Sequence, residues 1–366
     1  MCRRRANKRC WQRSRPRDHQ CFHTLALLHA GRAHRVRREG CAGHAGSGVV
    51  SVVKKYDTSR PVTAALAGVV MSNEVGYPEA LDVVGYNYLE FRYPEDHKKY
   101  PDRVIYGSEN GMNLNAWNAV AENDFISAQY LWTGIDYLGE ARAWPSRSNG
   151  AGLLDLAGFP KDVYYMYQSE WSAKPVLHIF PHWNWKPGQL VDVWAYYNNA
   201  DEVELFLNGK SLGIRRKNDS TLHVMWRVPF KAGTLKAVSR KNGKIILIKE
   251  IKTAGEAARI ELAVDKTNLR SGEKDLSFVT ARILDKKGNL VPYADDLIKF
   301  SITGNGIIAG TDNGYQADTV SLKSQERKCW KGLSLAIIQS TEKKGNITLT
   351  ATSPGISSAT ITIRNN

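Results

Sequence analysis

The spacing of four short apolar segments constrains the fold of this chain more than any other feature. Their starts lie 20, 21 and 23 residues apart, and they cover residues 62–66, 82–88, 103–109 and 126–132. Residues 94–100 and 115–124, between them, have helical character, and a last helix is predicted over residues 161–171. Strands that alternate with short helices at this spacing indicate βα units around a parallel sheet.

Polar or ionisable residues follow these predicted strands where each one ends. Asn87 and Tyr88 end the second strand, Glu109 ends the third, and Trp132 ends the fourth, with Asp136 shortly after it. In a (β/α)8 barrel this edge of the sheet holds the active site. Four βα units make half of such a barrel, and half a barrel leaves sheet edges and an interior layer exposed. We therefore expect this half to be supplemented by another chain or incomplete.

The second part of the chain has the period of β-strands. Asn208-Gly209 and Asn242-Gly243 are strong signals for two-residue hairpin turns. Residues 173–254 are therefore predicted to form a small antiparallel sandwich of about seven strands, and residues 255–366 a second one. The predicted fold class is α/β plus all-β: the C-terminal half of a (β/α)8 barrel over residues 49–172, followed by two immunoglobulin-like β-sandwiches.

The net charge of +15 is concentrated near the N-terminus. Residues 1–48 contain 12 of the 51 basic residues, 2 of the 36 acidic ones and four of the five cysteines, so the other 318 residues carry only +5. This distribution does not predict nucleic-acid binding, which needs basic residues clustered on a folded face. Residues 1–48 have no hydrophobic periodicity and no paired zinc-ligand spacing. We expect them to be an unstructured, Arg/Cys-rich extension without a bound metal, such as a frameshift or truncation artefact produces.

Glu109 is a candidate for carboxylate chemistry. Glycoside hydrolysis needs two carboxylates, one to attack or activate water and one to protonate the leaving oxygen. Glu109 follows the small residues Gly107 and Ser108, which leave room for a bulky substrate. Judged from the residues alone, a surface glutamate at a strand end is the simpler interpretation.

Several segments resemble glycoside hydrolase family 2, which includes β-galactosidases and β-glucuronidases. Four of them are similar to the last four strands of its barrel: DTSRPVTAAL (57–66), DVVGYNY (82–88), VIYGSENG (104–111) and LWTGIDYLGE (131–140). Three more are similar to the barrel-closing loop with its final helix and to the sandwich that follows: GLLDLAGFPKDVYYMYQSEW (152–171), PHWNW (181–185) and ADEVELFLNGKSLG (200–213).

The resemblance implies a role for individual residues. Glu109 matches the family's nucleophile, and Tyr88 matches a tyrosine whose hydroxyl contacts that carboxylate. A phenol donor beside a carboxylate favours its ionised form, which a nucleophile needs. Trp132 matches a tryptophan that forms a flat floor for the sugar, or else it lines the barrel core. The implied neighbours of the substrate are Asn87, Asp136, Glu140 and Trp144, and for each of them loop hydrogen bonding or packing is the alternative.

The chain departs from the family pattern at the general acid/base. The resemblance places this group, a Glu after an Asn, ahead of residue 57, where the chain has the extension with Glu39 as its one glutamate. Asn73-Glu74 imitates the dipeptide but falls between the predicted fifth and sixth strands, so we do not assign it this role. Trp183 and Trp185 are predicted to pack rather than to form a sugar platform.

The function implied by the resemblance is that of a retaining exo-β-glycosidase of β-galactosidase type, acting through a covalent glycosyl-enzyme. The chain as it stands is expected to be weak or inactive alone. The alternative is a non-catalytic carbohydrate-binding or adhesion protein derived from such an enzyme. We expect a β-galactoside-like carbohydrate partner, no cofactor, no nucleic acid and no membrane span, because no apolar run approaches about 20 residues. The sugar, the linkage, the oligomeric state and the location stay open, although relatives in polysaccharide-degrading bacteria are commonly exported to the periplasm or secreted.

Overall fold

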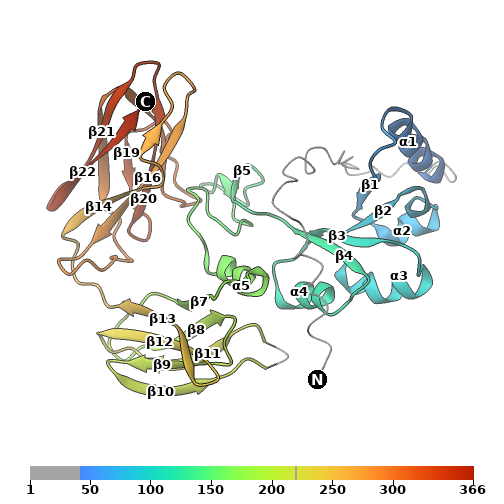
Figure 1. Cartoon of the computed structure of the whole chain (residues 1–366), viewed down its shortest axis with the longest axis horizontal. Coiled ribbons are helices and arrows are strands. Elements are labelled where there is room, and N and C mark those ends of the chain that lie inside the picture. The colour runs from blue at the N-terminus through green and yellow to red at the C-terminus, as the bar shows by residue number, and fades with distance from the viewer. Residues whose placement is uncertain (1–41, 219–220) are drawn as a thin grey trace. The chain divides into compact units, whose positions relative to one another are not determined.

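The computed structural model describes residues 42–218 and 221–366, with only the backbone described for residues 42–47 (Figure 1). It divides the chain into two units, Met1–Thr133 and Gly134–Asn366. Most of the predicted extension lies outside the described residues. Its last residues belong to helix α1 (Ala42–Tyr56), so regular structure begins earlier than predicted. Three glycines, which are poor helix formers, hide this helix start in the sequence.

The first unit contains a parallel sheet in the strand order β1–β2–β3–β4. The strands are β1 (Thr63–Leu66), β2 (Val83–Asn87), β3 (Ile105–Asn110) and β4 (Ile126–Leu131). The helices that follow the first three are α2 (Val69–Glu74), α3 (Tyr93–Lys99) and α4 (Leu114–Ala121), with 3-10 turns at Pro78–Ala80 and Glu90–Arg92. The predicted alternation of parallel strands and helices is confirmed at the predicted places.

One face of this sheet is buried against the helices. Its core contains Ala64, Leu66, Val69, Val84, Tyr86, Tyr93, Ile105 and Ile126. Because successive residues of a strand point to opposite faces, Thr63, Gly85 and Tyr106 belong to the other face. There the Thr63 hydroxyl donates to the Tyr106 hydroxyl at 3.1 Å. A Cβ atom at Gly85 would lie 2.9 Å from Cζ of Tyr106, so only glycine lets this ring cross β2.

The second unit begins with a long irregular segment. It contains the short paired strands β5 (Tyr137–Leu138) and β6 (Ser148–Asn149) and ends at helix α5 (Asp162–Trp171), which begins within one residue of its predicted start. No helix among the described residues is long and apolar enough to cross a bilayer.

Seven strands then form two antiparallel sheets, in the orders β11–β8–β7 and β10–β9–β12–β13. One cluster of buried residues draws on Val193 and Ala195 from the first sheet and on Val203 and Leu205 from the second, so the two sheets pack face to face. The strands are β7 (Leu177–Phe180), β8 (Leu190–Tyr197), β9 (Glu202–Leu207), β10 (Lys210–Arg215), β11 (Val224–Pro229), β12 (Thr234–Lys241) and β13 (Lys244–Lys252).

Local signals in this sandwich behave as predicted. Asn208 and Gly209, with φ of 51° and 82°, join β9 to β10, and Asn242 and Gly243, with φ of 51° and 74°, join β12 to β13. Positive φ at both central residues is what a type I′ hairpin requires. Trp183 is fully buried in the sandwich core, which confirms that it packs.

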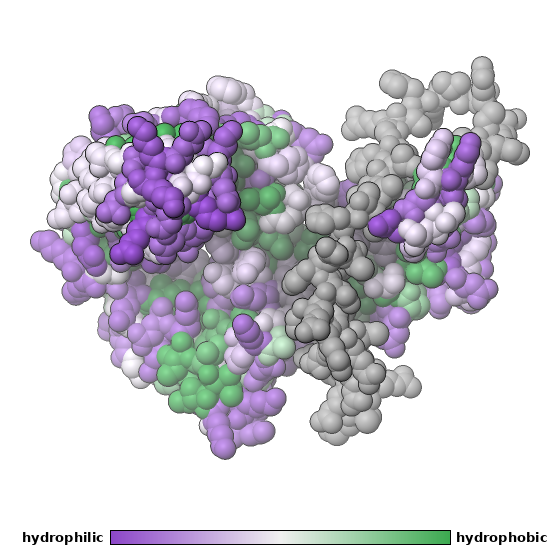
Figure 2. Space-filling view, turned by 45° about the horizontal axis from the view of Figure 1, so that its top comes forward, coloured by the Kyte–Doolittle hydropathy of each residue, from purple (hydrophilic) through white to green (hydrophobic). Residues whose placement is uncertain are grey.

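The edge strand β13 exposes apolar side chains. It pairs with β12 on one side and ends its sheet, while Ile245 and Ile248 are 57% and 54% exposed. Figure 2 shows a hydrophobic patch on the surface of the second unit. An exposed apolar edge strand is a template for pairing with another chain.

The remaining nine strands form one sheet in the order β18–β20–β16–β14–β22–β21–β17–β19, with β15 paired to β22. Strands β14 and β22 pair only at Arg259 and Ser357, and the two halves of the sheet share one core that includes Val279, Phe300 and Leu349. The strands are β14 (Arg259–Val264), β15 (Asn268–Leu269), β16 (Leu276–Leu284), β17 (Leu297–Gly304), β18 (Gly306–Asp312), β19 (Glu326–Lys328), β20 (Leu333–Ser340), β21 (Gly345–Ser353) and β22 (Ile356–Asn365).

Candidate active site

The carboxyl edge of the parallel sheet brings three of the predicted site residues together. Asn87 and Glu109 are paired in register at the ends of β2 and β3. The backbone amide of Tyr88 donates to the carbonyl of Glu109 at 2.8 Å. This confirms that Tyr88 and Glu109 lie at the same edge of neighbouring parallel strands, whereas contact between the Tyr88 hydroxyl and the Glu109 carboxylate stays a prediction.

A buried side chain directly after Glu109 fixes the end of β3. Asn110 is fully buried, and its Oδ1 accepts a hydrogen bond from the Tyr93 hydroxyl at 3.0 Å. A Cβ atom at Gly107 would lie 1.8 Å from this Oδ1, so the glycine makes room for the amide. Glu90 accepts from the backbone amide of Gly111 at 2.7 Å. Glu109 is therefore followed directly by two anchored positions, which limit the freedom of this end of the strand.

Tyr88 has an unusual backbone conformation. Its φ is 54°, in the left-handed region that residues other than glycine seldom adopt, and it is 46% exposed. Such residues cluster at functional sites, because the surrounding structure must hold them there. Trp132, the predicted sugar floor, directly follows β4 and is partly buried.

A polar network on the helix-covered face of the sheet holds α3, the helix that follows Tyr88. The Tyr86 hydroxyl donates to Oδ2 of the buried Asp96 at 2.9 Å, and Nη2 of Arg92 donates to Oδ1 at 2.7 Å. Burial raises the pKa of Tyr86 to about 12, so it stays a neutral donor. The network ties α3 to β2 and thereby limits the freedom of the loop between them.

Glu74 lies at the other end of the sheet. It ends α2, which follows β1, and Nη1 of Arg103 donates to the neighbouring Asn73 at 2.9 Å. Arg103 precedes β3, whereas Glu109 lies near the end of this strand, so about 20 Å of strand separate Arg103 from Glu109. Glu74, next to the residue that Arg103 contacts, lies on the Arg103 side. Retaining glycosidases place their two carboxyl groups about 5–5.5 Å apart. The interpretation of Glu74 as unrelated to catalysis is therefore supported.

Two predicted substrate neighbours lie in the second unit and differ in exposure. Asp136 is buried, and its Oδ1 accepts from Nζ of Lys161 at 2.6 Å and from the amide of Gly152 at 2.8 Å. These bonds favour the alternative of loop hydrogen bonding for Asp136. Trp144, between β5 and β6, is 83% exposed, so its ring is available for stacking.

Asp155 is the carboxyl group with the most altered acidity in this segment. Its Oδ1 accepts from the amides of Ala157 and Phe159 at 3.0 and 2.9 Å. Burial, together with the nearby charges of Asp136 and Asp312, nevertheless raises its pKa to about 6.

We expect Asp155→Asn to stabilise the protein at pH 8 but not at pH 4. The folded pKa of about 6 exceeds the unfolded value of about 3.9, so stability is lost as pH rises through this interval. Asparagine keeps the Oδ1 acceptor and removes the charge, which should raise the free energy of unfolding at pH 8 by about 1–3 kcal/mol. Urea unfolding at both pH values measures this, with the exposed Asp295→Asn as control. An equal effect at both pH values would contradict the assignment.

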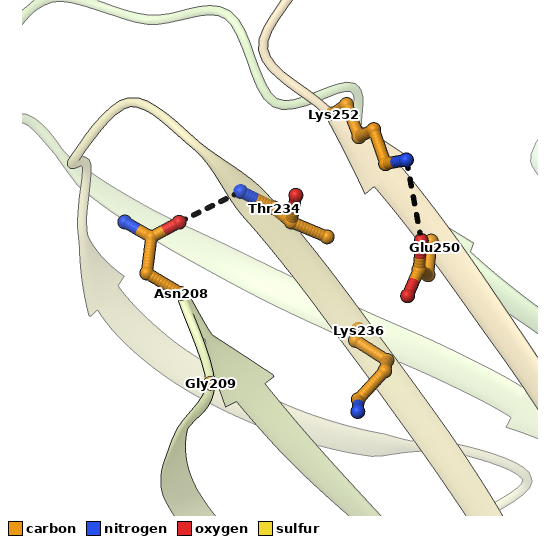
Figure 3. Close-up of a pocket in the computed structure, with 6 residues that line it drawn as sticks. All are labelled: Asn208, Gly209, Thr234, Lys236, Glu250 and Lys252. Carbon is orange, nitrogen blue, oxygen red and sulfur yellow. Dashed lines mark hydrogen bonds and ion pairs between the residues drawn. The ribbon is translucent and has the colours of Figure 1, made fainter.

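The second unit also has a shallow hollow of about 370 Å³ (Figure 3). It is lined by Asn208, Gly209, Thr234, Lys236, Glu250 and Lys252. Four of its lining residues pair with one another: Asn208 accepts from the amide of Thr234 at 2.8 Å, and Lys252 lies 3.5 Å from Glu250. It offers a single carboxylate, so it does not suit two-carboxylate chemistry. Nor does any group of three or more His, Cys, Asp or Glu side chains in residues 42–218 and 221–366 suit a metal ion.

Sequence reasoning missed the residues that anchor the site. Asn110, Glu90 and Tyr93 act through contacts between β3 and the segment after β2, which no local pattern indicates. One signal was present: Asn110 is a polar residue at the end of an apolar strand that also contains a glycine.

Comparisons with known proteins match both sandwiches. Residues 260–362 match the model described as glycoside hydrolase family 2 C-terminal domain 5, and residues 188–247 match a domain of unknown function, DUF4982.

Relatives extend the match into the parallel sheet. Beta-galactosidase BoGH2A of Bacteroides ovatus is 44% identical over 363 residues, covering 86% of this chain and 43% of that protein. A beta-glucuronidase of Formosa agariphila is 22% identical over 255 residues, covering 68% of this chain and 25% of that protein. The crystal structure of a glycosyl hydrolase family 2 member from Bacteroides cellulosilyticus has a TM-score of 0.83 at 32% identity, covering 88% of this chain and 47% of that chain.

The chain shares its mostly β architecture with this crystal structure. The chain belongs to glycoside hydrolase family 2. It spans less than half the length of the relatives described above.

Proposed function

We propose that this chain carries the nucleophile of a retaining exo-β-glycosidase of β-galactosidase type, with Glu109 as that nucleophile. The observation that carries the proposal is the place of Glu109 at the end of β3, in register with Asn87 and bonded through its carbonyl to the amide of Tyr88. The 44% identity to a relative named beta-galactosidase supports this choice of sugar.

The fold that belongs to this proposal is the C-terminal half of a (β/α)8 barrel over residues 49–172. Two immunoglobulin-like sandwiches then follow, over residues 173–254 and 255–366. The sequential parallel order of β1 to β4, with helices packed on one face, supports the first assignment. The antiparallel sheets with shared cores support the second.

In the proposed first step the Glu109 carboxylate attacks the anomeric carbon. The bond from that carbon to the leaving oxygen breaks, and the leaving oxygen takes a proton from a general acid. A hydroxyl donor at Tyr88 would orient the Glu109 carboxylate, and the ring of Trp132 offers a flat surface to the sugar. Water then attacks the glycosyl-enzyme, which restores Glu109 and releases the sugar with its configuration retained.

The presence or absence of a proton donor determines which glycosides the chain can cleave. Glu109 lies near the end of β3 and acts as the nucleophile in this proposal. Protonation of a sugar leaving group therefore needs a second carboxylate. A nitrophenolate departs without a proton, whereas general acid catalysis contributes about 10²–10⁴-fold for poor leaving groups. We therefore expect the 366-residue chain to cleave a dinitrophenyl β-galactoside in preference to lactose by about that factor.

Hydrolysis of dinitrophenyl β-galactoside, dinitrophenyl β-glucuronide and lactose by the purified chain tests the proposal. The expected order is the aryl galactoside first, with the glucuronide slower. Faster cleavage of the glucuronide would overturn the choice of sugar. Binding of galactosides with no cleavage of either aryl glycoside would favour the alternative of a non-catalytic carbohydrate-binding protein.

A further inference from the structure

Strand β3 contains one extra residue just before Glu109. Gly107 pairs with Tyr86 of β2, and Glu109 pairs with Asn87, so two steps along β3 match one step along β2. On the other side of β3, the register with β4 shifts in the same stretch. Ser108 is therefore the extra residue of a β-bulge, a device that re-aims the side chains next to it.

The bulge changes the faces on which the last side chains of β3 lie. A Cβ atom at Gly85 would lie 2.9 Å from Cβ of Ser108, so Ser108 lies on the face that carries Gly85 and Tyr106, the Tyr106 face. Regular alternation would place Asn110 on the Tyr106 face as well. Instead, Oδ1 of Asn110 would lie 1.8 Å from a Cβ atom at Gly107, on the helix-covered face.

Glu109 owes its orientation to this change. In a regular strand Glu109 would share the helix-covered face with Gly107, against the core of the unit. Its partner Asn87 comes two residues after Gly85 and therefore belongs to the Tyr106 face. Because paired residues of neighbouring strands lie on the same face, Glu109 lies on the Tyr106 face, where a ligand can meet the carboxylate.

Tyr93 holds this arrangement from the helix-covered side. Its hydroxyl donates to Oδ1 of Asn110 at 3.0 Å, and both side chains are fully buried. Burial, together with the charge of Glu90, raises the pKa of Tyr93, so its hydroxyl stays a donor. A return of β3 to regular alternation would move Asn110 away and leave this buried hydroxyl without its acceptor, which is costly. The hydrogen bond therefore stabilises the bulge.

We propose that Tyr93 is a positioning residue: by binding Asn110 on the helix-covered face, it keeps the bulge at Ser108 and thereby aims the Glu109 carboxylate at the substrate. This inference rests on the proposed function, because it takes Glu109 as the nucleophile. It adds that the aim of the nucleophile depends on a buried tyrosine on the opposite face of the sheet.

The test uses an activated 2-deoxy-2-fluoro β-galactoside, which traps the nucleophile covalently. The concentration dependence of labelling gives half-saturation, which reports affinity, and a limiting rate, which reports attack by the carboxylate. We expect Tyr93→Phe and Asn110→Leu each to lower the limiting rate on the order of 10²-fold with half-saturation unchanged, because a displacement of about 1 Å is enough for such a loss. The double variant should lose no more than either single variant, because both changes remove the same hydrogen bond.

Tyr100→Phe, just after the last residue of α3, is the matched control and should keep both values of the parent. An unlabelled parent chain overturns the proposed function, and this inference with it. A labelled parent whose Tyr93→Phe variant keeps the limiting rate overturns the inference alone, as does a multiplied loss in the double variant. A merely structural role of Tyr93 would lower the final labelled fraction and the thermal stability but not the limiting rate, and this result would also overturn the inference.

Discussion

Glu109→Ala is expected to reduce hydrolysis of dinitrophenyl β-galactoside by on the order of 10⁴–10⁶-fold. In the proposed mechanism the Glu109 carboxylate forms the covalent intermediate, so its removal prevents bond formation at the anomeric carbon. Initial rates of the parent and the variant at saturating substrate measure this. Because Glu74 lies at the opposite edge of the sheet, Glu74→Ala is the matched control and should keep the parent rate.

A small anion separates loss of the nucleophile from loss of structure. Azide can occupy the space left by the Glu109 side chain and attack from the same face, so it should restore part of the rate in Glu109→Ala and give a galactosyl azide of inverted configuration. Equal activity of Glu109→Ala and the parent would remove Glu109 from the mechanism, and loss of activity in Glu74→Ala would indicate a different pair of carboxylates.

Arg327→Met is expected to lower the stability of the C-terminal sandwich by about 3–5 kcal/mol. Asp318 loses its ion-pair partner in a site where Arg327 itself is 0% exposed, and the carbonyls of Thr311 and Ser321 lose their donor. Hydrogen exchange of peptides from β18 and β20 measures the local free energy of opening.

The control for this variant is Arg364→Met, at an exposed arginine of β22. Substitutions at exposed positions usually change stability by no more than about 0.5 kcal/mol. A loss below about 1 kcal/mol in Arg327→Met would mean that the segment holding Asp318 and Ser321 does not depend on this arginine.

The secondary structure could be predicted from local sequence patterns. The predicted third strand, 103–109, became Ile105–Asn110, and the predicted helix over 161–171 became Asp162–Trp171. Both hairpins at Asn-Gly formed, since these residues tolerate the positive φ of a type I′ turn. Such features depend on neighbours in the chain, which a single sequence displays.

Contacts between distant residues could not be predicted in this way. Arg147 and Asp312 form an ion pair at 3.2 Å although they are 165 residues apart, and a buried arginine such as Arg327 looks like any surface arginine in the sequence. Asp136 was a predicted substrate neighbour, but its bond to Lys161 depends on how an irregular segment folds back. Asn87, Tyr88 and Glu109 were predicted at strand ends, where the structure has them, because strand ends are a local feature, whereas the contacts that support them are tertiary.

Mass spectrometry of the chain after reaction with an activated 2-deoxy-2-fluoro β-galactoside tests the central claim most directly. The fluorine slows both steps, and the activated leaving group lets the first proceed without a proton donor, so the glycosyl-enzyme accumulates. We predict one fluorogalactosyl group per chain, attached to the carboxylate of Glu109. A label on another residue, or none while dinitrophenyl β-galactoside is still hydrolysed, would contradict the assignment of Glu109 as the nucleophile.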